Sequence, residues 1–371
     1  MAALAAIQAP IDAWRTSYLT SAISFAVPGT VVAAARGDDP VVLASSGDAV
    51  LGWGGRALSV DDAFHIGSMT KLFTAVLIFQ LDGSGALSLD DTLDTWFPEA
   101  PNGDRITVRM LLQHESGLSE LDMALVGVDT PQQVIDDVFS RPPVADPGTA
   151  YEYLNAGYII LGRVAEETSG RRYADLLRSR LIGPPGLHDT YLDEGGGSSS
   201  APVSGYDLGC SGDTTIADCR GKPTGPIAVD PDPSPQWTGA WSAGGMVSTA
   251  RDQAVWIRAL VTGDVVSEAH RAEMAALTPL SASSYQEFYA ATGLPPVQLG
   301  EGTGLTSWNV PGVGRCLGHA GAIPGSNGFA AYCPDTHLTV VALNIMNPAG
   351  LTPGYPGLPS LAPAALSALV G

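Results

Sequence analysis

Basic residues are scarce in this chain, and lysine is almost missing. The 371 residues carry 38 acidic and 18 basic side chains, for a formal net charge of −20. Nucleic acids and anionic membrane surfaces are bound by clusters of cations, so this shortage argues against both as partners. Sixteen of the basic residues are arginine, which stays protonated, and only Lys71 and Lys222 are lysine.

Cysteine is also rare. No Cys-x-x-Cys pair and no His-rich tract is present, so the sequence predicts neither a zinc site nor any other metal site. A hairpin centred between Pro324 and Gly325 would place two of the cysteines opposite each other, within disulfide reach. Two interpretations stay open: two local disulfides in an oxidising compartment, which we favour, or separate thiols in a cytosolic protein. The two pairs would be Cys210 with Cys219 and Cys316 with Cys333.

Targeting and membrane-spanning features are weak. Residues 1–12 lack the basic start and apolar run of a signal peptide, although oxidised cysteines would indicate an extracellular or periplasmic protein. Residues 16–35 are uncharged over the length of a membrane span. They contain several Ser and Thr residues and a central Pro28-Gly29, so we interpret them as a helix end, a turn and a strand.

Strand-like runs occur near both ends of the chain, and helical patterns fill the middle. The sequence therefore predicts an α/β fold, in which both termini build one antiparallel sheet flanked by helices and an all-α region is inserted. We expect one domain over 1–371, with an α/β part at 1–85 and 240–371 and a mainly helical insert at 86–239. Residues 194–240 are rich in Gly, Ser and Pro and too long for a plain loop, so we expect surface or site structure there. The expected strands are 30–35, 41–44, 314–319, 329–333 and 338–345, and the expected helices are 71–81, 108–114, 132–139, 155–170, 172–181, 251–260 and 361–370.

Ser68-Met-Thr-Lys71 is the first motif with chemical meaning. Positions i and i+3 share a helix face, so the serine hydroxyl and the lysine amine can meet. A serine needs a neighbouring base to attack a carbonyl, and an amine serves as one when burial keeps it partly neutral. Lys71 leads into an apolar helical run, which provides such burial. Most Ser-x-x-Lys matches are surface accidents, but the scarcity of lysine weakens that interpretation here.

Two further patterns have both a structural and a functional interpretation. Tyr153-Leu-Asn155 is typical of a packed ring followed by a helix N-cap, yet a phenol and an amide beside Lys71 would also share in proton transfer and substrate binding. His319-Ala-Gly321 is typical of an ordinary strand. It would equally provide a strand edge that a substrate approaches, with the N–H groups of Ala322 and Ser68 as an oxyanion hole.

Together the three motifs resemble those of the penicillin-recognising serine hydrolases, which include class C β-lactamases, serine D-Ala-D-Ala carboxypeptidases, D-aminopeptidases and esterases. The similarity extends over about residues 20–350 and includes the flanking stretches 106–117, 147–155 and 242–252. The resemblance implies a serine β-lactamase/DD-peptidase-like fold and an acyl-enzyme on Ser68. It implies proton transfer by Lys71 and Tyr153, with the resting base left open, and substrate binding by Asn155, His319 and Gly321. It implies no cofactor.

Two departures from the family pattern bear on the substrate. His319 stands where true β-lactamases carry lysine, which favours the carboxypeptidase, aminopeptidase and esterase branches. Residues 302–309 contain no cation for a free substrate carboxylate, and the nearest is Arg315. We expect a small-molecule or peptide substrate, with β-lactams as acylating ligands. The predicted activity is a D-Ala-D-Ala carboxypeptidase, D-stereospecific peptidase or amidase; a carboxylesterase or acyl transferase and a non-catalytic penicillin-binding sensor are the alternatives.

Overall fold

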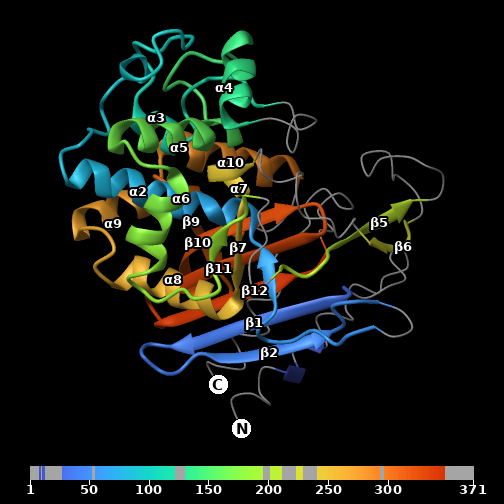
Figure 1. The fold of residues 1–371 in the computed structure, drawn as a ribbon. Helices are drawn as coiled ribbons and strands as arrows, with labels where there is room; N and C mark the ends of the chain where they lie inside the picture. Colours follow the sequence, from blue (N-terminus) through green and yellow to red (C-terminus); the bar gives the residue numbers. More distant parts are fainter. Residues whose placement is uncertain are drawn as a thin grey trace.

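A seven-stranded antiparallel sheet forms the centre of the molecule (Figure 1). The computed structural model describes residues 8–9, 11–12, 27–51, 55–121, 130–194, 201–210, 223–228, 240–292 and 296–346. The strand order is β2-β1-β12-β11-β10-β9-β8. The strands are β1 (Gly29–Arg36), β2 (Val42–Gly47), β8 (Gln298–Glu301), β9 (Thr306–Val310), β10 (Gly314–Ile323), β11 (Ser326–Cys333) and β12 (Leu338–Asn344).

The first and last strands of this sheet lie side by side. β1 pairs with β12 from Thr30 opposite Asn344 to Arg36 opposite Leu338. β1, β11 and β12 are buried along nearly their whole length, as strands covered on both faces are. The sequences of β1 and β12 are accordingly apolar with little alternation. The prediction of an α/β fold whose antiparallel sheet is assembled from both ends of the chain is confirmed.

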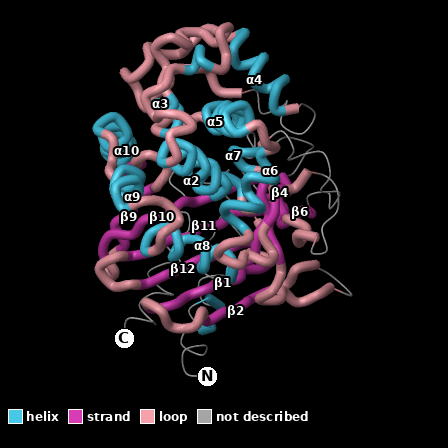
Figure 2. Tube along the Cα trace, turned by 60° about the vertical axis from the view of Figure 1, so that its left-hand side comes forward, coloured by secondary structure: helices cyan, strands magenta, loops and turns pink. Residues whose placement is uncertain are grey.

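Most helices gather above the β8–β10 end of the sheet, and α8 lies along β1, β11 and β12 (Figures 1 and 2). Helices α9 and α10, which the sequence analysis did not predict, lie between α8 and β8 in the chain. The residues of α10 are largely small, polar or aromatic, so no apolar stripe of period 3.6 reveals it. The helices are α2 (Thr70–Gly83), α3 (Val108–Leu112), α4 (Pro131–Ser140), α5 (Asn155–Ser169), α6 (Tyr173–Leu176), α7 (Trp241–Gly244), α8 (Ala250–Thr262), α9 (Glu268–Ala275) and α10 (Pro279–Thr292), with the 3₁₀ turns η1 (Gly67–Met69) and η2 (Leu93–Thr95) and the π-helical segment η3 (Leu177–Ile182) that continues α6.

Two small sheets accompany the main one. A three-stranded sheet joins β3 (Ala63–His65), β7 (Met246–Thr249) and β4 (Tyr191–Leu192). The connection predicted over 194–240 carries a hairpin of β5 (Tyr206–Cys210) and β6 (Pro223–Ala228). Cys219 and the expected helix over 361–370 lie outside the described residues, so the Cys210–Cys219 disulfide and that helix stay predictions.

The expected hairpin between β10 and β11 is confirmed. Ile323 pairs with Ser326 and Leu317 with Tyr332, the register that a turn centred between Pro324 and Gly325 requires. At the other end of this hairpin, Cys316 and Cys333 form a disulfide. No helix among the described residues is long and apolar enough to cross a membrane. The second half of the uncharged segment 16–35 is strand β1, as expected, and residues 16–26 lie outside the described part.

Candidate active site

Ser68 lies in the tight turn η1, directly before α2, and β10 packs against this turn. Two glycines make the close approach possible. A Cβ atom on Gly321 would lie 2.0 Å from the carbonyl oxygen of Ile66 and 3.0 Å from the backbone nitrogen of Ser68. Gly67 has a φ of +51°, and a Cβ there would lie 2.8 Å from the nitrogen of Ala322. The backbones of Ser68 and Ala322 are therefore neighbours.

This packing gives Gly321 a different role from the one expected. Its missing side chain was expected to let a substrate approach, whereas the space is filled by the backbone of Ile66–Met69. The edge of β10 beside the turn is nevertheless open, because β9 pairs with β10 only from Gly314 to Gly318 in the described part of the chain. Ala320 and Ala322 are exposed on this edge.

Lys71 follows one turn after Ser68 and is fully buried. Its amine donates hydrogen bonds to Ser68 Oγ at 3.0 Å, to Asn155 Oδ1 at 2.8 Å and to the carbonyl oxygen of Ala243 at 2.9 Å. Three acceptors satisfy a charged ammonium. A neutral amine would keep the bonds to Asn155 and Ala243 and direct its lone pair at the Ser68 hydroxyl. The site thus accommodates both protonation states of the amine.

The protonation balance of Lys71 is set mainly by burial. Loss of water around the amine lowers its pKa to about 7, while the carboxylates of Glu120 and Glu301 act in the opposite direction. Close to neutral pH, a large fraction of the amine is therefore unprotonated. Lys71 has the property that the sequence analysis required of a base beside a nucleophilic serine.

Tyr153 completes the group around Ser68. The Lys71 amine lies 4.9 Å from the centre of the Tyr153 ring, and the Tyr153 hydroxyl hydrogen-bonds Ser68. Burial, followed by the charge of Glu301, raises the pKa of Tyr153 well above its usual value, whereas the bond to Ser68 opposes this shift. Tyr153 is accordingly a neutral phenol at the pH where Lys71 titrates.

Asn155 is oriented by a residue that sequence analysis missed. Glu120 accepts the backbone N–H groups of Asn155, at 2.7 Å, and of Ala156, at 3.2 Å, and so caps the start of α5. The same carboxylate accepts the Asn155 side-chain amide at 3.3 Å. This contact turns the amide nitrogen towards Glu120 and leaves the amide oxygen for Lys71. Glu120 lies 35 residues before Asn155, so no local pattern connects the two.

His319 lies beside the site as a buried, neutral ring. Burial, reinforced by the charge of Lys71, lowers the pKa of His319 to about 4. Its Nδ1 contacts the carbonyl oxygen of Ala320, so this nitrogen carries the hydrogen. The three motifs of the sequence therefore meet in one place, and His319 adds no positive charge to it at neutral pH.

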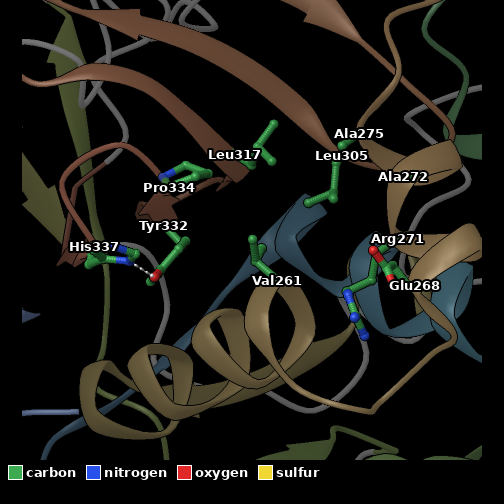
Figure 3. Close-up of a pocket in the computed structure, with 10 residues that line it drawn as sticks. All are labelled: Val261, Glu268, Arg271, Ala272, Ala275, Leu305, Leu317, Tyr332, Pro334 and His337. Carbon is green, nitrogen blue, oxygen red and sulfur yellow. Dashed lines mark hydrogen bonds between the residues drawn. The ribbon is translucent and has the colours of Figure 1, made fainter. Parts of the chain in front are cut away.

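A separate cavity of about 300 Å³ lies on another part of the molecule (Figure 3). Its walls come from α8, α9, β10 and β11, and the labelled side chains include Arg271 and Tyr332. None of the motif residues lines it. Among the described residues, no group of three or more His, Cys, Asp and Glu side chains is placed to hold a metal ion.

Comparison with known proteins identifies the family. The beta-lactamase family profile matches residues 19–351. Penicillin-binding protein 4 of Amycolatopsis lactamdurans is 28% identical over 350 residues, which cover 91% of this chain and 84% of that protein. D-amino acid amidase from Ochrobactrum anthropi SV3, complexed with L-phenylalanine amide, is 25% identical with a TM-score of 0.80, and the match covers 100% of this chain and 99% of that one. D-stereospecific amidohydrolase from Streptomyces sp. is 26% identical with a TM-score of 0.71 over 90% and 94% of the two chains. The chain belongs to the beta-lactamase family and is a serine hydrolase.

Proposed function

We propose that this protein hydrolyses the amide bond of D-amino-acid amides or short D-peptides through an acyl-enzyme on Ser68. The observation that carries the proposal is the contact of Ser68 with Lys71, a fully buried amine whose pKa lies at about 7. The D-amino acid amidase and D-stereospecific amidohydrolase among its structural relatives support the substrate class.

The first half of the reaction follows from the hydrogen bonds around Ser68. Neutral Lys71 accepts the Ser68 proton as Oγ attacks the substrate carbonyl, and the resulting ammonium is stabilised by Asn155 and Ala243. The N–H groups of Ser68 and Ala322 stabilise the oxyanion that forms. Of the two bases that the sequence left open, we therefore infer that Lys71 is the resting one, because the Tyr153 phenol holds its proton far too tightly.

Collapse of the tetrahedral intermediate needs a proton on the leaving nitrogen. Tyr153 bonds to Ser68 and lies beside the Lys71 amine, so its phenol passes a proton to the amine product and regains one from Lys71. The acyl group is then bonded to Ser68 Oγ. Water attacks it in the reverse sequence, which gives the free acid and restores neutral Lys71.

The described strand β9 offers no cation to the open edge of β10, and this feature narrows the substrate class. Strand β9 carries none, and Arg315 donates to Ser307 Oγ at 2.9 Å and to the carbonyl oxygen of Ala275 at 2.8 Å. Carboxypeptidase activity requires recognition of a free C-terminal carboxylate, for which a guanidinium group is well suited. An uncharged amide or ester leaving group fits this edge better than a terminal D-alanine. The same observation supports carboxylesterase activity as the second candidate.

The decisive experiment compares D-phenylalanine amide, L-phenylalanine amide, a D-Ala-D-Ala peptide and a short aryl ester as substrates. We expect turnover of the D-amide above that of its L-enantiomer, and little of the D-Ala-D-Ala peptide. Mass spectrometry after exposure to a β-lactam should show one adduct on Ser68 that is absent in Ser68→Ala. Ester turnover without amide turnover would establish the second candidate, and an unmodified Ser68 without any turnover would contradict both.

We also propose that the protein works in an oxidising compartment, outside the cell or in a periplasm. The Cys316–Cys333 disulfide ties the two strands next to the site, and such bonds persist where thiols are not kept reduced. Reduction of the purified protein should lower its melting temperature. An unchanged melting temperature after complete reduction would argue that the bond has no structural role.

A further inference from the structure

A buried histidine lies directly behind Tyr153, outside the three motifs. The His114 ring stacks on the Tyr153 ring, with centroids 4.4 Å apart and planes 28° from parallel. Its Nδ1 accepts the N–H of Leu154 at 3.0 Å, so the hydrogen of the neutral ring is on Nε2. Burial, followed by the charge of Lys71, keeps the pKa of His114 well below its usual value. His114 is therefore a neutral ring with a fixed orientation.

The free nitrogen of this ring faces a buried carboxylate. His114 Nε2 lies 3.7 Å from Glu301 Oε2, at the end of β8. Glu301 accepts hydrogen bonds from the Tyr151 hydroxyl at 3.0 Å and from Thr306 Oγ1 at 3.3 Å, and its own N–H donates to Ser281 Oγ at 2.6 Å. Its carboxylate is thus fixed by neutral donors and removed from solvent.

The amine of Lys71 is the charged group on which these residues act. Six titratable groups surround its amine from the neighbouring elements: Glu120 before α4, Glu301 of β8, His114 after α3, His319 of β10, Tyr153 before α5 and Tyr158 of α5. The two histidines and the two tyrosines are neutral near pH 7, so among these six described groups the two carboxylates favour the charged amine.

The two carboxylates differ in what else they do. Glu120 acts more strongly on the pKa of Lys71, but it also caps α5 and orients Asn155. Glu301 has no hydrogen bond to Ser68 or Asn155 in the described structure. Burial raises the pKa of its carboxyl group, whereas the hydrogen bonds from Tyr151 and Thr306 and the charge of Lys71 lower it. The charge of the carboxylate acts on Lys71 through buried surroundings that screen it little. An effect of Glu301 on the reaction can therefore be distinguished from a change in the geometry of the motif residues.

We propose that Glu301 is a positioning residue of the active site, a buried counter-charge beside His114 that sets the pH range in which Lys71 accepts the proton of Ser68. The inference rests on the proposed function for the identity of the reaction. Removal of this negative charge disfavours the ammonium form of Lys71, so the pKa of the amine falls and the acid limb of the pH–rate profile moves to lower pH.

The small number of lysines makes a direct measurement possible. Lysine labelled with ¹³C at Cε gives two resonances, because the chain holds only Lys71 and Lys222, and Lys71→Arg assigns them. We expect the Lys71 midpoint, close to 7 in the unmodified protein, to fall by roughly half a pH unit or more in Glu301→Gln. Lys222 is the internal control. Tyr285→Phe is the matched variant, since it alters the ring packed against Tyr151 and removes no charge.

An unchanged Lys71 midpoint in Glu301→Gln would overturn the proposal, as would an equal shift in Tyr285→Phe. If Glu301→Gln does not fold, Glu301→Asp provides the test with the charge retained. In Glu301→Asp, the titration midpoint of Lys71 should stay near that of the unmodified protein. A fall in this midpoint as large as the one expected for loss of the charge would refute the proposed role of Glu301.

The rate of Ser68 acylation by a β-lactam, measured against pH in the same variants, separates this inference from the proposed function. The acid limb in Glu301→Gln should move by the same amount as the Lys71 resonance. A shifted resonance with an unshifted limb would overturn the catalytic part of the inference. Absence of acylation at every pH would contradict the proposed function, and the resonance would still decide whether Glu301 acts on Lys71.

Discussion

The amine of Lys71 lies 2.8 Å from the amide oxygen of Asn155, and 84 residues of chain separate the two. Lys71 comes from the first turn of α2 and Asn155 from the first residue of α5. The side-chain amide of Asn155 is polarised by its hydrogen bonds to Lys71 and Glu120. A change at any one of these three residues therefore alters the interactions of the other two. Four predictions follow from this relationship and from the packing around Ser68.

Replacement of Lys71 by arginine should abolish activity although the charge is retained. Arginine stays protonated at all relevant pH values, so it cannot accept the Ser68 proton. We expect kcat/KM to fall by about a thousandfold or more, the order of loss seen when the base beside a nucleophile is removed. Steady-state kinetics between pH 6 and pH 10 provide the measurement. Near-normal activity, or recovery at high pH, would exclude Lys71 as the base.

Replacement of Lys71 by methionine should make the protein more stable than the unmodified protein at neutral pH. This gain in stability should shrink as the pH rises. The native pKa of about 7 lies below the unfolded value of 10.5, so between these values the unfolded chain binds one more proton. The stability of the unmodified protein therefore gains about 1.4 kcal/mol per pH unit from this group. Urea unfolding of both proteins at pH 7 and pH 9 should show their difference shrink by about 2–3 kcal/mol. A difference independent of pH would contradict the buried neutral amine.

Loss of the Glu120 side chain should affect stability and catalysis together. Glu120→Ala removes the acceptor for two N–H groups at the start of α5, at a cost of about 1–2 kcal/mol in the free energy of unfolding. It also frees the Asn155 amide to rotate, so we expect a lower kcat for every substrate.

Glu120→Gln is the matched variant for this prediction, because its amide oxygen still accepts one of the N–H groups. Chemical unfolding and kcat should place it between the unmodified protein and Glu120→Ala. Normal kcat in Glu120→Ala would show that Asn155 is held without Glu120.

Addition of a single methyl group at Gly321 should disrupt the site. The Cβ of Gly321→Ala would lie 2.0 Å from the carbonyl oxygen of Ile66, so β10 must move away from the turn that carries Ser68. We expect loss of most acylation activity. Gly157→Ala is the control, since its nearest neighbour would be 3.4 Å away and alanine favours the helix in which it lies. Equal activity in the two variants would refute the close approach.

The sequence by itself predicted which residues carry the chemistry. A serine three positions before one of two lysines, at the head of an apolar helix, is a local pattern, and helix geometry alone places Ser68 beside Lys71. The β10–β11 hairpin and its disulfide are local in the same way, because strand register follows from the position of the turn. Strand-like runs at both ends were enough to predict a sheet built from both termini, although β8 and β9 are not among the expected strands.

The tertiary structure alone decided the electrostatics and the supports of the site. The pKa of Lys71 depends on complete burial by α5, α7 and β10, and on carboxylates 49 and 230 positions further along the chain. Glu120 and Glu301 are common residue types that no periodicity or spacing marks. His114 lies in the stretch 106–117 that resembles the family, but nothing local indicates its contact with Tyr153. Their roles arise because desolvation and charge interactions act through space, between segments that only the folded chain brings together.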